Sequence, residues 1–189
     1  MKIFLTVILT LIGLGILGVM FIYSGVYDVS AANKENGFMT WFLSTTSDNS
    51  VEHHAEGIKV PDLNNPAMIK EGFAHYKEMC QGCHGGPGQE ETELAKGLNP
   101  PAPDLSESGQ EMSAEELFWV TKNGIKMTGM PAWGKTHPDS KIWAIVAAVK
   151  RLHETSAAEY NAYPVETDKS DTAKPEEKSD LHKQKLRYH

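Results

Sequence analysis

The chain contains very little cysteine: of its 189 residues, only Cys80 and Cys83 carry a thiol. A zinc site on this pair would need two further nitrogen or sulfur ligands at a compatible spacing, and a thioredoxin-like site would need a βαβ context. Neither is visible, and no alternating apolar and polar run reaches the length of a strand. The sequence therefore predicts an all-α fold. A surplus of basic residues is also missing, since the net charge is −7, and this disfavours nucleic-acid binding.

Both cysteines belong to one pentapeptide, Cys80-Gln81-Gly82-Cys83-His84. Its C-x-x-C-H spacing places the two thiols about one helical turn apart. Thiols at this separation can add across the two vinyl groups of a haem, while the adjacent imidazole reaches the iron from one face. The motif therefore predicts a covalently bound haem c.

A second motif, Gly129-Met130-Pro131, lies about 45 residues after the first. The glycine and the fixed φ of the proline let an irregular loop hold a thioether at one position. With these two motifs the chain resembles the monohaem class I cytochrome c family over about residues 66–155. The resemblance implies a class I cytochrome c fold around one haem c, with His84 and Met130 as the two axial ligands of the iron.

Two alternatives to Met130 remain at the sixth position of the iron. Met127 lies only three residues earlier in the same loop, and a lone methionine is often core filler. An open sixth position is the other alternative. It would change the class of protein, because an open iron can bind a substrate or a gas.

Between the two motifs lies a proline-rich stretch, with Pro100, Pro101 and Pro103 within four residues. Prolines at this density make a stiff, extended loop that lacks several backbone donors. The loop is predicted to form a wall of the haem site, with the Pro100 carbonyl accepting the Nδ1–H of His84. Such an acceptor fixes the tautomer and the orientation of a ligating histidine. The alternative is a rigid surface linker.

The N-terminal segment from Ile3 to Tyr23 has no charged residue. As a helix it would extend about 31 Å, enough to cross the core of a bilayer. Lys2 predicts that its N-terminal end stays in the cytoplasm, so that the rest of the chain faces outward. A cleaved signal peptide is the alternative, with a passable cleavage site at Val29-Ser30-Ala31. The apolar run is longer than the usual h-region, which favours an uncleaved anchor.

The composition along the chain predicts four regions. The last of them is rich in charges of both signs and poor in apolar residues, as is typical of a disordered tail. The regions are a transmembrane anchor at 1–23, a periplasmic connector at 24–64, a cytochrome c domain at 65–160 and a charged tail at 161–189.

The connector is acidic, and it also contains a cluster of four large apolar residues, Phe38, Trp41, Phe42 and Leu43. A cluster of this kind beside a membrane is predicted to lie at the bilayer interface or to pack against a partner. His53 and His54 resemble metal ligands, but no other ligand is in register with them. We therefore expect this pair to be ordinary surface or packing residues.

Within the domain, capping signals predict the starts of three helices, at Asn65, Ser113 and Pro138. The last of these helices carries an apolar stripe at helical spacing. In the family that the chain resembles, the first and last helices cross beside the haem, with small and aromatic residues at the crossing. Gly72, Phe73 and Trp143 match that role here.

Together these features predict a one-electron carrier and not an enzyme, anchored in a bacterial inner membrane with its haem domain in the periplasm. Its partner would be a membrane-bound redox complex, either one that oxidises quinol or a terminal oxidase or reductase. Two alternatives belong to other classes of protein. One is a fixed haem c subunit of a larger respiratory complex, and the other is a haem enzyme or gas sensor with an open iron site.

Overall fold

A computed structural model describes residues 2–33 and 37–165. The described part is helical and contains no strand, which confirms the predicted all-α class. Most of the predicted charged tail, from residue 166 onward, lies outside the described residues. The elements are α1 (Lys2–Tyr23), α2 (Gly37–Ala55), α3 (Pro66–Met79), α4 (Gln81–His84), α5 (Glu93–Lys96), α6 (Ser108–Glu111), α7 (Ala114–Asn123), η1 (Trp133–Lys135), α8 (Asp139–Val149), η2 (Leu152–Glu154) and α9 (Ala157–Ala162).

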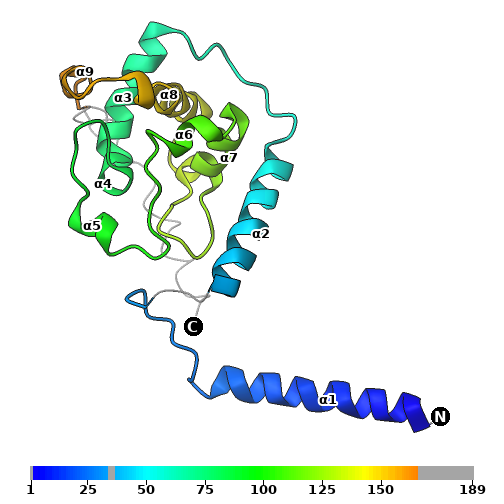
Figure 1. Ribbon diagram of the computed structural model, residues 1–189. Coiled ribbons are helices and arrows are strands. Elements are labelled where there is room, and N and C mark those ends of the chain that lie inside the picture. Colours follow the sequence, from blue (N-terminus) through cyan, green and yellow to red (C-terminus); the bar gives the residue numbers. More distant parts are fainter. Residues whose placement is uncertain (1, 34–36, 166–189) are drawn as a thin grey trace, which may run out of the picture.

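Helix α1 stands apart from the other helices (Figure 1). It has 22 residues and none of them is buried, although nearly all its side chains are apolar. Thr6 and Thr10 each donate their hydroxyl hydrogen to the backbone carbonyl four residues earlier, so neither polar group is left without a partner. By length and composition α1 can cross a membrane. A signal sequence near the N-terminus would have the same properties.

Helix α2 lies within the region that the sequence analysis treated as a connector. Val51 and Ala55 are buried, and the ring of His54 lies 5.4 Å from that of Trp119 on α7. The C-terminal half of α2 therefore packs against the helical domain, as Figure 1 also shows. Among the described residues, no three His, Cys, Asp or Glu side chains gather as a group that could hold a metal ion. The ring of His54 takes part in the contact of α2 with α7, and the interpretation of His53 and His54 as ordinary residues stays a prediction.

The crossing of α3 and α8 is the most extensive helix contact in the domain. It depends on Gly72, where an added Cβ would lie 1.9 Å from the carbonyl oxygen of Ala144 and 3.0 Å from the Cβ of Ala148. Only a residue without a Cβ lets the two backbones approach this closely. On α8 the ring of Trp143 stacks on Phe118 with centroids 4.1 Å apart. The predicted crossing of the first and last domain helices at Gly72 is therefore present.

We expect Gly72→Ala to lower the free energy of unfolding of the domain by about 2 kcal/mol. The new Cβ would force the two helices apart, which costs about 3 kcal/mol as overpacking, and the higher helix propensity of alanine offsets about 1 kcal/mol of this. Denaturant unfolding followed by circular dichroism measures the change. Gly97→Ala is the control, because its Cβ would lie 3.5 Å from its nearest neighbour. Equal stability of the two variants would contradict the close crossing.

Helix α8 differs from the amphipathic helix that its sequence predicted. All eight residues from Ile142 to Val149 are buried, so no face of this part of the helix reaches solvent. Helices α3 and α7 pack against α8, and Ile145, Val146 and Val149 also line the internal cavity described below. Ala144 and Ala148, which do not belong to the predicted stripe, lie at the close contact with Gly72 of α3.

Helix α9 was missed by the sequence analysis, which ended the domain at residue 160. Tyr160 is fully buried, with its ring edge-on to Phe73 and Tyr76 and its hydroxyl donating to Gln81 Oε1 at 2.9 Å. Tyr163 stacks on Phe73 with centroids 4.2 Å apart. Packing therefore continues three residues beyond the predicted boundary, and α9 contacts α3 through the ring of Tyr160.

Two of the predicted helix starts have the expected side-chain caps. Asn65 Oδ1 accepts the backbone N–H of Ala67 at 2.9 Å, and Ser113 and Glu116 form a reciprocal capping box at the start of α7. Helix α8 begins directly after Pro138, as predicted, although no side chain caps it. These local signals fix where α3 and α7 begin, and therefore which residues face the space between them.

Candidate functional site

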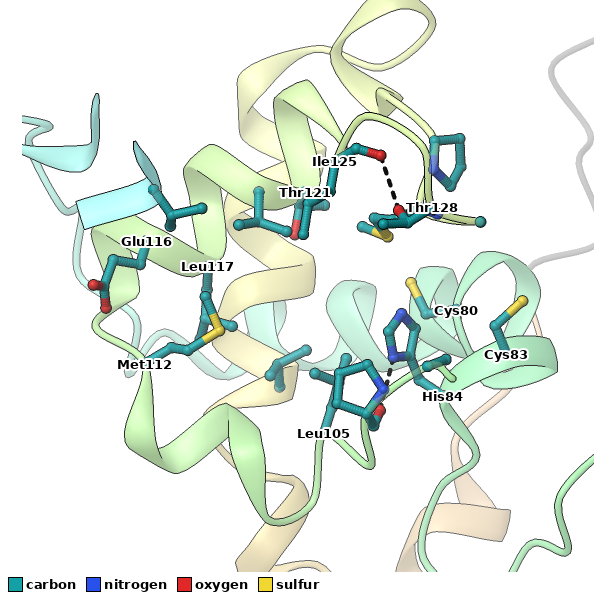
Figure 2. Close-up of a pocket in the computed structure, with 18 of the residues that line it drawn as sticks. Cys80, Cys83, His84, Leu105, Met112, Glu116, Leu117, Thr121, Ile125 and Thr128 are labelled. Atoms are coloured by element: carbon teal, nitrogen blue, oxygen red, sulfur yellow. Dashed lines mark hydrogen bonds between the residues drawn. The ribbon is translucent and has the colours of Figure 1, made fainter. Parts of the chain in front are cut away.

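A cavity of about 450 Å³ lies inside the domain. This volume is within the range of about 300–1,000 Å³ that is typical of ligand sites. Most of its lining is apolar and comes from α2, the end of α3, α4, the proline-rich loop, α7, the loop after α7, and α8. Figure 2 shows two facing walls, with Cys80, His84 and Leu105 on one side and Thr121, Ile125 and Thr128 on the other.

The short helix α4 brings Cys80, Cys83 and His84 to one end of the cavity. Cys80 ends α3 and precedes α4, and its carbonyl accepts the backbone N–H groups of Cys83 at 3.1 Å and His84 at 2.9 Å. One helical turn therefore fixes the spacing of the three side chains, and all three line the cavity. The turn ends at Gly85, where φ is +68°, a conformation that favours glycine. The Gly85 carbonyl accepts the hydroxyl hydrogen of Tyr76.

The ring of His84 is held in one tautomer. Its Nδ1 lies 2.9 Å from the carbonyl oxygen of Pro103 (Figure 2 marks this bond). A carbonyl can only accept, so Nδ1 carries the hydrogen and the neutral ring keeps a lone pair on Nε2. Burial lowers the pKa of His84, partly opposed by the Pro103 hydrogen bond and the charge of Asp104. The imidazole is therefore neutral at neutral pH, in the form that ligates a metal.

The acceptor for His84 differs from the prediction, which named Pro100. Pro100 lines the cavity, but the carbonyl that meets Nδ1 belongs to Pro103. Proline removes donors from this loop and leaves every carbonyl free, so composition alone does not select one of them. The loop turns directly after Pro103, where Asp104 Oδ1 accepts the backbone N–H of Ser106 at 2.7 Å. This turn sets which carbonyl faces the ring.

The two thiols have different environments. Cys80 is only 7% exposed, and burial raises the pKa of its thiol to about 12, with a further contribution from Cys83. Cys83 is partly exposed. The structure records both as free thiols, so no disulfide joins them, and both sulfurs remain available for a covalent bond to a cofactor in the cavity.

The loop after α7 is closed by three hydrogen bonds. Thr128 Oγ1 donates to the carbonyl of Ile125 at 2.8 Å and accepts the backbone N–H of Met130 at 3.1 Å, while the backbone N–H of Ile125 reaches the carbonyl of Met130 at 3.3 Å. The loop is thus folded on itself, and Met130 lines the cavity. Figure 2 places Ile125 and Thr128 on the wall opposite His84.

Met127 has the opposite environment. It is 96% exposed, it does not line the cavity, and its φ of +61° places it at a turn of the loop. Of the two methionines that the sequence left in competition, Met130 alone is at the cavity. This geometry favours Met130 over Met127 as a ligand.

Two other methionines also line the cavity and were missed by the sequence analysis, Met79 at the end of α3 and Met112 before α7. In Figure 2 Met112 lies beside Leu117, at the end away from the cysteines. Met79 directly precedes the C-x-x-C-H motif and Met112 directly precedes the capping box at Ser113, but neither motif indicates that the methionine beside it lines a cavity. Helix α2 was missed in the same way, and it adds Ser47, Asp48 and Val51 to the lining.

Comparison with known families is consistent with this geometry. Residues 67–147 match the family described as cytochrome c oxidase, cbb3-type, subunit III. No curated protein matches the chain. The match spans Cys80, Cys83, His84, Met130 and the crossing at Gly72, and it excludes α1, α2 and α9. The chain therefore contains a c-type cytochrome domain, with further helices on both sides of the matched region.

The residues of the cavity fit a haem c. The lining is largely apolar, as a macrocycle requires. A neutral histidine with a free Nε2, two free thiols one turn apart and a methionine thioether all border the same space. These are the donor types that hold the iron and the vinyl groups in c-type cytochromes.

Proposed function

We propose that this c-type cytochrome domain binds one haem c covalently and acts as a one-electron carrier at a membrane. Cys80 and Cys83 would hold the porphyrin through thioether bonds, and His84 and Met130 would ligate the iron. The observation that carries the proposal is the His84 tautomer, which the Pro103 carbonyl fixes with Nε2 available beside the two thiols.

The bound group supplies a reversible one-electron couple between ferric and ferrous iron. The residues of the chain set its properties. The Pro103 carbonyl holds the His84 ring and raises its basicity as a ligand, and the closed loop around Thr128 holds Met130. A thioether ligand favours the ferrous state and raises the potential. With histidine and methionine both bound, no substrate would reach the iron, which supports a carrier over an enzyme or gas sensor.

The proposed location rests on α1. We propose that α1 stays in the bacterial inner membrane as a single span, with Lys2 on the cytoplasmic side and the haem domain in the periplasm. The length of the apolar run supports an anchor over a cleaved signal peptide. The two free thiols are proposed to be used for covalent attachment of haem. This use is compatible with a domain that is exported to the periplasm.

The partner is proposed to be a membrane-bound redox complex. The family matched by residues 67–147 is named for a subunit of a terminal oxidase, and this supports such an oxidase as electron acceptor. It also supports a second candidate function, in which the chain is a fixed subunit of that kind of complex. A free carrier and a fixed subunit differ in whether the chain separates from its partner in mild detergent.

Purification of the full chain from membranes in mild detergent tests the proposal. We expect one band that stains for haem on a denaturing gel, a ferric spectrum with the iron–thioether band, and a redox titration that follows a single one-electron step. Carbon monoxide should not bind the ferrous protein. Rapid binding of carbon monoxide by the unmodified protein would contradict ligation by Met130 and favour the open-site alternative. Co-purification with an oxidase would favour the fixed subunit.

A further inference from the structure

Helix α2 presents an exposed aromatic cluster in its N-terminal half. Phe38 is 68% and Trp41 60% exposed, and Phe42 is about half exposed. The Phe38 ring centroid lies 5.9 Å from that of Trp41 and 6.3 Å from that of Phe42, so Phe38 packs against both of the other rings at the surface of the helix. No charged residue lies between Gly37 and Ser47. We call these three residues the aromatic end of α2.

The C-terminal half of α2 is held by the domain, and it therefore fixes the orientation of the whole helix, including its aromatic end. Val51 and Ala55 are buried, and Ser47, Asp48 and Val51 line the cavity. One half of the helix is therefore part of the domain, while the aromatic end extends beyond it. In Figure 1 the start of α2 lies at the end of the domain that faces α1.

The chain connections keep this end close to α1. Thirteen residues, 24–36, separate α1 from α2, and an extended chain of this length spans at most about 45 Å. The linker is also tied to the domain, because Asn99 Nδ2 donates to the carbonyl of Asn33 at 2.8 Å. Asn99 precedes Pro100 in the loop that lines the cavity. Asn33, ten residues after the end of α1 and four residues before the start of α2, is thus tied to the loop that forms one wall of the cavity.

We propose that the aromatic end of α2 inserts into the headgroup region of the bilayer that holds α1, and so holds the haem domain against the membrane surface. Tryptophan and other aromatic rings favour this region. An uncharged helical face can enter it without desolvating a charge. The acidic residues of α2, Asp48 and Glu52, lie in the half that the domain holds. The inference rests on the proposal that α1 remains as an anchor.

The consequence concerns electron transfer. The helix that rests on the bilayer also contributes Ser47, Asp48 and Val51 to the cavity wall. The height of the cavity above the membrane is then set by one helix that packs on the domain and not by the length of the connection between α1 and α2. A redox partner embedded in the same membrane would meet the domain in a restricted range of orientations, which lowers the entropy lost on docking.

Photo-crosslinking of the full chain in its native membrane tests the inference. A benzophenone amino acid is placed at position 41, and in separate chains at position 12 inside α1 and at position 52 in the exposed, acidic part of α2. Mass spectrometry then identifies what each position captures. We expect phospholipid adducts at positions 12 and 41 and none at position 52. Phe38→Ser with Phe42→Ser should greatly reduce the adduct at position 41 and leave the haem spectrum unchanged.

The three positions separate the possible failures. A lipid adduct at position 12 without one at position 41 would leave the anchor in place and overturn the inference. Adducts at position 41 to a protein in place of lipid would also overturn it, and would identify the aromatic end as a contact with a partner subunit. A chain that begins near Ala32 and lacks position 12 would overturn both the anchor and the inference, while haem staining of the same sample would still report on the proposed cofactor.

Discussion

Replacement of Met130 by alanine is expected to open the sixth position of the iron. The variant should lose the iron–thioether absorption band, bind carbon monoxide in its ferrous form and have a lower reduction potential, because the ligand that favours ferrous iron is gone. Axial ligands tune haem potentials over roughly 0.8 V, so the shift should be large for a single substitution. Absorption spectroscopy and a redox titration measure all three effects.

Met127→Ala is the matched control for this experiment. Both residues belong to the same loop, but Met127 is almost fully exposed and does not line the cavity. Its replacement should leave the spectrum and the potential unchanged. The reverse result, with Met127→Ala removing the band and Met130→Ala keeping it, would show that the loop rearranges when haem binds. If both variants kept the iron–thioether band, the result would favour Met79 or Met112 as the ligand, since both also border the cavity.

Loss of both thiols, in Cys80→Ala with Cys83→Ala, is expected to abolish covalent haem attachment. Each thioether fixes one side of the macrocycle. Either single variant should therefore retain a smaller amount of haem, bound less stably, and the double variant should retain none on a denaturing gel. Haem staining beside an immunoblot of the same gel measures the loss per chain. Covalent haem in the double variant would contradict the proposed attachment.

Serine variants separate the loss of the bond from the loss of packing. Cys80 is buried, so Cys80→Ala also removes a side-chain atom from the core, whereas Cys80→Ser keeps a similar volume and still forms no thioether. Both Cys80 variants should therefore show the same partial loss of haem stain. Cys83 is partly exposed, so Cys83→Ala should change the stability of the unloaded chain less than Cys80→Ala does. A serine variant that stains like the unmodified protein would exclude a thioether at that position.

The sequence predicted most of the local chemistry of the site. The pentapeptide from Cys80 to His84 predicts its own geometry, because three side chains within one helical turn have nearly fixed relative positions. The caps at Asn65 and Ser113 were likewise predictable, since each depends on the properties of one residue and its neighbours. The crossing at Gly72 was expected only from the resemblance to the cytochrome c family, because Gly72 meets Ala144 on a distant helix. The apolar run of α1 was also predictable from the local sequence, because it depends only on consecutive residues.

The features that the sequence missed all depend on contacts between distant segments. Helix α2 reads as a connector because its composition is mixed, yet it packs on α7, its residues Val51 and Ala55 are buried, and Val51 lines the cavity. Tyr160 lies in a short segment with little periodicity, yet it is fully buried against Phe73 and Gln81. No local signal reports a partner such as Gln81, which lies 79 residues away from Tyr160.

The surroundings of His84 show most clearly which features the sequence determines and which the tertiary structure decides. By itself, the sequence determined that a histidine and two thiols lie together, that a methionine follows in a loop and that an apolar helix precedes the domain. The tertiary structure alone decided that Pro103 and not Pro100 meets Nδ1, and that Met130 borders the cavity while Met127 faces solvent. Spacing within one helical turn is set by backbone geometry. The choice among several similar groups in a loop is set by the turns and packing that fold the loop against the rest of the chain.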